Sequence, residues 1–320
     1  MTTAHPRNRS ALRNRRHIAP VLGLLALALV AAMPACAATP INETRPLDPM
    51  GSIDIDNVKG LIQVRAWDRP EVRIEGSLGE GVEKLEIEGD REHLSIKVRY
   101  PNRGSGMGFL VGGDKSEPTE LRLTVPLQAK LEIDAVSATV DVNGVAPRDL
   151  SIDSVSGDVI VAAAPREAEI ESVSGDLRLT LNSAKVSAQT VSGDLSLRGR
   201  LNGEVDIETV SGKVDVTTRE SRLAKLSGNS VSGDLRVTGA LADGGEISLE
   251  TVSGDVRLSL PRALSATVRG QSFSGDLSAP DAQIVRPKHG PGSSFEHRYG
   301  NGSGSIKIET FSGDATLELN

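Results

Sequence analysis

The stretch Val155-Ser156-Gly157-Asp158 occurs in eight closely related copies along the second half of this 320-residue chain. The copies follow the pattern Val/Phe-Ser-Gly-Asp/Lys and begin at Val155, Val173, Val191, Val210, Val231, Val252, Phe273 and Phe311. Successive copies are 18 to 21 residues apart, except for a last step of 38 residues that spans two units, one of them degenerate. A weaker copy begins at Val136. Such a period predicts a repeat protein, in which small units stack into one continuous core.

Within each unit, apolar residues alternate with polar residues, which is the period of a strand rather than of a helix. Ala168 and Ile170 have one parity, whereas Val173 has the other. The phase therefore changes at Glu171-Ser172, where we expect the chain to bend or bulge. This interpretation places the Val and Gly of each motif inside and its Ser and Asp outside. In the alternative, Ser-Gly-Asp is itself the turn, with Gly at positive φ.

Stacked coils of about 18 to 21 residues predict an all-β fold, a parallel β-solenoid whose strands pair with their equivalents at about 4.8 Å. A left-handed hexapeptide helix needs an aliphatic residue every six positions, and a calcium-binding nonapeptide array needs two Gly-rich motifs per 18 residues; neither pattern is present. Residues 51–134 have strand patterning without good repeats, so we expect an irregular N-terminal cap region continuous with the solenoid. The repeat solenoid itself is expected over 135–320, with a loop insertion at 285–305.

The repeats from Val155 to Gly313, with the opening segments 51–61 and 64–68, resemble a family of bacterial envelope proteins known as "putative adhesins", of unknown function, built as β-solenoids from repeated Val-Ser-Gly-Asp units. The resemblance covers most of the chain after its N-terminal segment. It implies a β-solenoid with a non-enzymatic role as an envelope scaffold or adhesin-like binding protein, and it supplies no catalytic residues. Lys213 in place of Asp, and the long step after Ser274, depart from the pattern.

The N-terminal 37 residues predict a secretory signal peptide. Five arginines and no acid precede an apolar run from Val21 to Met33, and Ala35-Cys36-Ala37 offers a cleavage site between small residues. The apolar run is short for a transmembrane helix. We therefore expect an exported protein of the periplasm or cell surface, with residues 38–50 as a linker.

Cys36 is the only cysteine, so no intramolecular disulfide can form. Met33-Pro34-Ala35-Cys36 is a poor lipobox, and two interpretations stay open. Either Cys36 carries a lipid anchor, which would be the chain's one attachment to a membrane, or it is discarded with the signal peptide.

The mature chain is acidic. Without the five signal arginines it has 31 basic and 43 acidic side chains, a net charge of −12 with histidine neutral. Such a surface repels nucleic acid and anionic lipid head groups. We therefore expect no nucleic-acid partner.

The motif aspartates are expected to align in an outward column. They are Asp158, Asp176, Asp194, Asp234, Asp255 and Asp276. Adjacent carboxylates at strand spacing repel by about 1 kcal/mol in water. In one interpretation, hydrogen bonds from serine hydroxyls or backbone N–H groups offset this repulsion; in the other, divalent cations such as Ca²⁺ bridge neighbouring carboxylates, making the chain a cation-binding repeat array. No other metal or cofactor site is predicted.

A glycan-active β-helix enzyme, a polysaccharide lyase or hydrolase, is the alternative function, because carboxylates are abundant. A catalytic pair should nevertheless depart from the repeat and have separated pKa values, whereas these acids are the repeat itself. Aromatic residues that could stack on sugars form only 2% of the chain. We therefore expect no enzymatic activity.

Two segments that interrupt the repeat are candidate binding loops. One has an apolar tip that includes Phe109 and Leu110. The other is basic and aromatic, with Arg286, Lys288, His289, Phe295, His297, Arg298 and Tyr299. Such loops suit recognition of an envelope protein or a glycan, although the second could instead be a disordered insertion.

The chain finishes in strand pattern at Leu317 and Leu319, with no evident cap. An uncapped terminal strand would present unpaired backbone groups to a neighbour. End-to-end self-association is therefore a hypothesis.

Overall fold

The computed structural model describes residues 39–101 and 116–320, and these residues form strands, turns and bends without a helix. In chain order the strands are β1 (Thr39–Pro46), β2 (Ser52–Trp67), β3 (Glu71–Leu78), β4 (Lys84–Gly89), β5 (His93–Arg99), β6 (Thr119–Pro126), β7 (Lys130–Asn143), β8 (Asp149–Ser154), β9 (Val159–Ala163), β10 (Glu167–Ser172), β11 (Leu177–Thr190), β12 (Leu195–Thr209), β13 (Val214–Thr218), β14 (Leu223–Ser230), β15 (Leu235–Thr238), β16 (Leu241–Thr251), β17 (Val256–Leu260), β18 (Ala266–Ser272), β19 (Leu277–Ser278), β20 (Ser293–Tyr299), β21 (Gly304–Thr310) and β22 (Ala315–Leu319).

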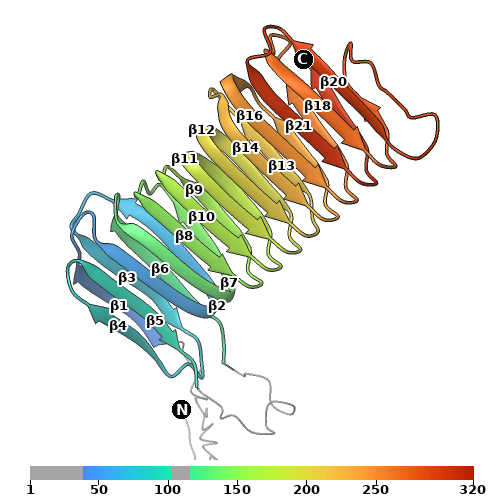
Figure 1. The fold of residues 1–320 in the computed structure, drawn as a ribbon. Helices are drawn as coiled ribbons and strands as arrows, with labels where there is room; N and C mark the ends of the chain where they lie inside the picture. The colour runs from blue at the N-terminus through green and yellow to red at the C-terminus, as the bar shows by residue number, and fades with distance from the viewer. Residues whose placement is uncertain (1–38, 102–115) are drawn as a thin grey trace, which may run out of the picture. The chain divides into compact units, whose positions relative to one another are not determined.

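The strands form a β-solenoid with two rows of parallel strands, as the repeat predicted (Figure 1). One row contains β8, β10, the second half of β11, the second half of β12, β14 and β16. The other contains β9, the first halves of β11 and β12, β13, β15 and β17. Each coil runs along the first row, bends at a Val-Ser-Gly corner, and returns along the second row.

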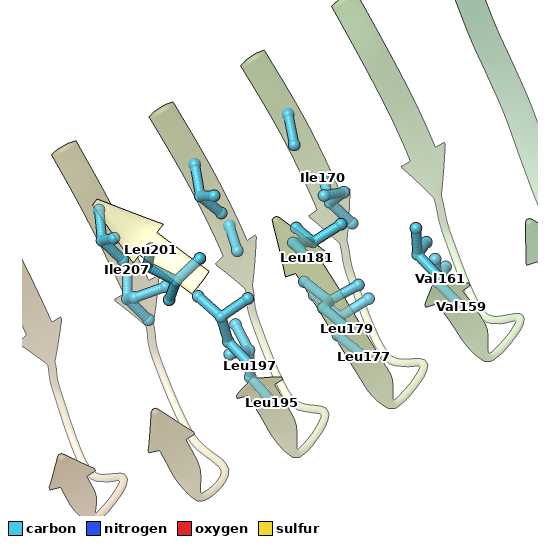
Figure 2. Packing of buried hydrophobic residues seen from close by; sticks show 14 of the residues in the cluster. Val159, Val161, Ile170, Leu177, Leu179, Leu181, Leu195, Leu197, Leu201 and Ile207 are labelled. Carbon is cyan, nitrogen blue, oxygen red and sulfur yellow. The ribbon is translucent and has the colours of Figure 1, made fainter. Parts of the chain in front are cut away.

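The core lies between the two rows and consists of stacked aliphatic side chains (Figure 2). Equivalent positions of successive coils pair in register, as Leu179 does with Leu197 and Leu197 with Val216. All three side chains are at most 1% exposed. Each coil therefore buries its apolar residues on its neighbours, which is why the alternation in sequence continues from coil to coil.

The valine of each motif points outward, so the prediction that it faces the core was wrong. Val155, Val173 and Val191 are 46%, 47% and 45% exposed. The preceding Ser or Thr is buried instead, and in most coils its hydroxyl bonds to the backbone of the motif glycine, as Thr190 Oγ1 does by accepting from Gly193 N at 3.2 Å. The phase therefore changes at Val-Ser, two residues later than predicted, because the inside of the corner has room for a small hydrogen-bonded side chain but not for valine.

The motif glycine faces inward because the next coil leaves no space for a Cβ. A Cβ on Gly175 would lie 2.0 Å from the carbonyl oxygen of Gly157, and one on Gly193 would lie 2.0 Å from that of Gly175. Of the motif glycines, Gly212 alone has a positive φ, 132°. The alternative interpretation was therefore right that the bend lies within the motif, but wrong in general about the glycine conformation.

Two buried corner threonines differ in their hydrogen bonding, and the stability of their variants can test the importance of this difference. Thr190 Oγ1 accepts the Gly193 N–H, whereas Thr209 Oγ1 has no hydrogen-bond partner among the described residues. Replacing Thr190 by Val should cost about 1–2 kcal/mol, because the Gly193 amide loses its partner, whereas Thr209→Val should be neutral or stabilising. Urea unfolding of both variants measures the difference. Equal losses would show that the corner hydroxyl does not contribute through this bond.

The chain terminus does not form the end of the stack. Strand β21 lies between β16 and β18 (Figure 1), and β22 pairs with β17 on one side and β19 on the other. Antiparallel β20 pairs with β18 beyond them and is the outermost strand at this end. The premise that the terminal strand is uncapped was therefore wrong: Leu317 is 2% exposed, and Asn320 N donates to Leu260 O at 2.9 Å.

Antiparallel strands also form the edges at the other end. Strand β1 pairs with β3, and β4 pairs with β5. Strand β1 occupies most of the segment that was expected to be a linker, residues 38–50, because the alternation around buried Ile41 gives it an inward face. Antiparallel edges interrupt the parallel ladder and limit further addition of coils.

Candidate binding groove

A groove of about 1530 Å³ follows the Val-Ser-Gly corners along the stack. Its first wall, here called the apolar ridge, consists of Val136, Val155, Val173, Val191, Val210, Val231, Val252, Phe311 and Phe273. Its second wall, the acidic ridge, consists of Asp56, Asp134, Asp153, Glu171, Gln189, Glu208, Asn229, Glu250, Glu309 and Gln271. The buried corner Ser and Thr residues form the floor between them. We call this feature the corner groove.

The apolar ridge is a continuous, half-exposed hydrophobic surface. Its side chains are between 45% and 55% exposed, and the rings of Phe273 and Phe311 stack at 4.6 Å with an interplanar angle of 7°. With coils about 4.8 Å apart, the nine residues extend for about 40 Å. Scattered apolar residues are normal on protein surfaces, but a contiguous apolar strip indicates an interaction site.

The acidic ridge brings carboxylates of successive coils together. Register pairs Asp56 with Asp134, Asp134 with Asp153, and Asp153 with Glu171. Partial burial raises the pKa of Asp134, and the neighbouring Asp153 and Asp56 carboxylates raise this pKa further. Partial burial likewise raises the pKa of Asp153, together with the carboxylates of Glu171, Glu169 and Glu132. Repulsion is therefore concentrated at this end of the groove.

The raised pKa of Asp153 predicts a pH-dependent gain in stability when its charge is removed. Because the carboxyl binds its proton more tightly in the folded than in the unfolded chain, its ionised form costs folding stability at neutral pH, and this cost disappears as pH falls through the folded-state pKa. Asp153→Asn should raise Tm at pH 7 by on the order of 1–2 °C, since the group is partly exposed and screened.

The difference should shrink as pH falls and vanish by about pH 3, where this carboxyl is mostly protonated in both the folded and the unfolded wild-type chain. Thermal unfolding between pH 3 and pH 8 measures it. Asp243→Asn is the control, because its side chain is 93% exposed and should show no such dependence. A stabilisation by Asp153→Asn that is the same at every pH would contradict the electrostatic cause.

A loop closes the groove at its C-terminal end. Val285, Pro287 and Pro291 line the groove there, and Val285 and Ser294 exchange backbone hydrogen bonds of 2.8 and 3.0 Å. Val285 is 57% exposed. The loop therefore adds apolar surface to the groove that the two phenylalanines also line.

The motif aspartates point outward as predicted, and backbone N–H groups hold their carboxylates. Asp176 N donates to Asp158 Oδ1 at 3.2 Å, and Asp194 N donates to Asp176 Oδ1 at 3.1 Å. The pattern continues at Asp234 and Asp255, and Asp276 pairs with Arg286 at 2.7 Å. Lys213 interrupts the carboxylates, but its own N–H still donates to Asp194 Oδ1 at 2.9 Å.

These bonds bear out the part of the hydrogen-bond interpretation that concerns backbone N–H groups, and bridging by divalent cations stays a prediction. In residues 39–101 and 116–320 there is no group of three or more His, Cys, Asp or Glu side chains placed to hold a metal ion.

The predicted basic and aromatic loop, residues 285–305, is partly strand. Phe295 and Tyr299 lie on β20, are 5% and 8% exposed, and belong to the core, so their assignment to ligand recognition was wrong. Both residues alternate with polar residues, which is the two-residue period of a strand. The Tyr299 hydroxyl donates to Pro280 O. His297 is half-buried against Tyr299, with ring centroids 4.5 Å apart.

The remaining polar residues of this segment are exposed. Arg298 donates to the Asn301 carbonyl, and Arg286 is paired with Asp276, whereas Lys288 and His289 lie in the exposed turn before β20. None of the four lines the corner groove. Phe109, Leu110 and Cys36 lie outside the described residues.

The sequence contained a signal for the groove that the parity argument missed. In every coil the residue two before the motif valine is an acid or amide on the same outward face, as Asp153 is before Val155. A small residue separates the two, Ser or Thr in every coil except at Val136, where it is Ala135. A buried Ser or Thr flanked by two outward residues predicts a furrow between two ridges.

The described part of the chain contains no helix long and apolar enough to cross a membrane. No curated protein matches the chain. A crystal structure of a "putative adhesin" from Parabacteroides distasonis is similar, with 13% identity, a TM-score of 0.48, and coverage of 88% of this chain and 98% of that one.

A "putative lipid binding protein" from the same organism has 10% identity and a TM-score of 0.40, with 87% and 96% covered. A "putative adhesin" from Bacteroides fragilis has 11% identity and a TM-score of 0.27, with 89% and 98% covered. A family model described as Toastrack DUF4097 matches residues 50–318, which include all strands from β2 to β21. The chain therefore belongs to the Toastrack DUF4097 family.

Proposed function

We propose that this chain is an exported, non-enzymatic binding protein of the cell envelope, with an adhesin-like or scaffold role, and that the corner groove is its recognition surface. The main support for this proposal is the apolar ridge, whose nine side chains are about half-exposed along the whole repeat. A solenoid has no need of valine at these positions for its core, which is already filled from the alternating inward positions. The N-terminal signal pattern supports export to the periplasm or cell surface.

Binding suits the groove better than catalysis does. Its polar groups repeat from coil to coil, with Asp153, Glu171 and Glu208 in equivalent positions. A catalytic site requires a unique arrangement that gives two groups different roles, whereas a repeated surface presents the same chemistry along its length. Extended contact with a long partner is the natural use of such a surface.

The test compares substitutions inside and outside the groove. Val191→Lys with Val210→Lys places two charges on the apolar ridge, and Leu127→Lys with Ile160→Lys is the matched control, because these residues are 45% and 41% exposed but do not line the groove. The purified mature protein and both variants are incubated with solubilised envelope fractions from the native cell. Bound material is quantified after circular dichroism has shown that all three are folded.

We expect the ridge variant to lose at least tenfold in retained material, whereas the control retains the wild-type level. Equal retention by the ridge variant and wild type would remove the groove as the recognition surface. Release of reducing or unsaturated sugars from envelope polysaccharide, lost in Asp153→Asn, would favour the glycan-active alternative. Fractionation of cells expressing the full chain tests export separately.

A further inference from the structure

The corner groove has the width of a single extended chain. The members of each ridge residue pair, such as Asp153 and Val155, are two positions apart in the chain and both exposed, with the second one in the bend that follows the strand. Two residues span at most about 6.5–7 Å when fully extended. An α-helix, with a diameter of about 10 Å, is too wide to enter between the ridges, whereas one extended polymer fits.

A partner cannot enter this groove as an added β-strand. The backbone groups at the corner already bond to neighbouring coils: Val173 N donates to Ser154 O at 3.1 Å, and Ser174 N donates to Val155 O at 2.9 Å. The serine hydroxyl takes the same carbonyl, with Ser174 Oγ donating to Val155 O at 3.1 Å. Recognition must therefore come from side chains rather than from main-chain pairing.

The acidic ridge lacks countercharges over much of its length. Asp134, Asp153, Glu171 and Glu208 form no ion pair with any described residue, whereas Glu250 and Glu309 share Lys307 at 2.9 and 3.0 Å. Several other acids of the solenoid are paired, as Glu204 is with Lys225 at 2.6 Å. The unpaired carboxylates face the groove, so the positive charges of a cationic partner would offset their negative charges.

An apolar ridge opposite an acidic ridge defines the partner's chemistry. In an extended polypeptide, successive side chains point to opposite sides. A segment lying along the groove would therefore place every second residue on the valines and the others on the carboxylates. An acyl chain would fill the apolar side but leave partly buried carboxylates without partners, which is unfavourable.

Taking the corner groove as the recognition surface proposed above, we infer that it binds an extended polypeptide segment in which apolar and basic residues alternate. Such a segment satisfies both ridges at once. Twelve extended residues span about 40 Å, which is the length of the apolar ridge. The partner in the envelope is then a protein with an exposed segment of this pattern, rather than a glycan or a lipid.

The test measures binding of fluorescent twelve-residue peptides by anisotropy at low salt, with the folded mature protein. The probes are an alternating Val-Lys peptide, a peptide with six Val followed by six Lys, and an alternating Ser-Lys peptide. We expect saturable micromolar binding of the alternating Val-Lys peptide and about tenfold weaker binding of the other two.

The variants assign the contacts. Two double variants should each weaken binding of the alternating Val-Lys peptide about tenfold: Asp153→Asn with Glu171→Gln, and Val173→Ser with Val191→Ser. Leu127→Ser with Ile160→Ser should leave its Kd unchanged. Each variant is used only if its Tm lies close to that of wild type.

Several results would overturn the inference. Equal affinities for Val-Lys and Ser-Lys would reduce the binding to non-specific charge attraction, and no binding of any peptide would exclude this partner class. Groove-dependent binding of neutral phosphatidylcholine vesicles without peptide binding would assign the apolar ridge to lipid. If peptide binding fails but the ridge variant still loses its envelope partner, the partner class is wrong and the groove stands; if neither assay responds to groove substitutions, both proposals fail.

Discussion

Gly193→Ala should destabilise the solenoid by about 3 kcal/mol, at the upper end of overpacking substitutions. The new Cβ would lie 2.0 Å from the carbonyl oxygen of Gly175, and that oxygen belongs to the backbone of the adjacent coil. Neither side can move without breaking ladder hydrogen bonds on both sides of the corner. Urea unfolding followed by far-UV circular dichroism measures the loss.

Gly244→Ala separates this collision from the general strain of replacing glycine. Gly244 has a φ of 72°, and a Cβ there would meet no atom within 4 Å. Its replacement should cost about 1–2 kcal/mol, from the left-handed conformation alone. A loss at Gly193 no larger than that at Gly244 would mean that neighbouring coils can separate at the corner, contrary to the packing described.

Leu197→Ala should cost about 2–5 kcal/mol, the range for truncating a buried leucine. Leu197 is 0% exposed and is held between Leu179 and Val216 of the adjacent coils. The solenoid backbone is fixed by ladders on both sides, so the resulting cavity cannot collapse fully. Thermal and urea unfolding both report the change.

Val191→Ala is the matched comparison, because the two residues lie close together in the same coil. Val191 is 45% exposed, so the methyl groups lost on truncation are only partly buried. The loss in the free energy of unfolding should be less than about 1 kcal/mol. A Val191→Ala loss as large as that of Leu197→Ala would place the motif valine in the core and contradict the corner geometry.

The repeat predicted the solenoid and the inward glycine correctly, because both depend on local rules. Alternation with a period of two requires strands, and a glycine repeated once per coil requires a close approach at one place in every coil. The hydrogen-bonded aspartate column could be predicted equally well from the sequence, since the motif places Asp158 and Asp176 at equivalent positions and the backbone N–H groups of the ladder lie beside them.

The orientation of the motif valine was mispredicted because the prediction considered the hydrophobicity of the side chain and not the space available inside the corner. Parity alone allows the phase to change at either Glu171-Ser172 or Val173-Ser174, and an apolar side chain favours the first. In the folded chain, the hydroxyl of Ser172 accepts the Gly175 N–H at 3.1 Å inside the bend. A buried hydrogen bond in a tight corner outweighs the partial exposure of one valine, which its neighbours in the ridge also shield.

The C-terminal arrangement could not be read from local patterns at all. Strand β21 is inserted between β16 and β18, so spatial order differs from chain order. The 38-residue step between the last two motifs indicated an irregularity, but it did not specify that the intervening segment forms the antiparallel strand β20. Burial of Phe295 and Tyr299 follows from that topology and not from their own sequence context.

Differential thiol labelling at one corner measures whether the motif valine lies outside and the residue before it inside. In a Cys36→Ser background, Thr190→Cys and Val191→Cys are each reacted with a maleimide under native conditions, with rates measured by mass spectrometry. Thr190 is 4% exposed and Val191 is 45% exposed. We expect Val191→Cys to react within about tenfold of the rate in the unfolded chain. Thr190→Cys should be strongly protected, since local opening must precede its reaction. Protection of Val191→Cys together with rapid labelling of Thr190→Cys would show that the corner is turned the other way.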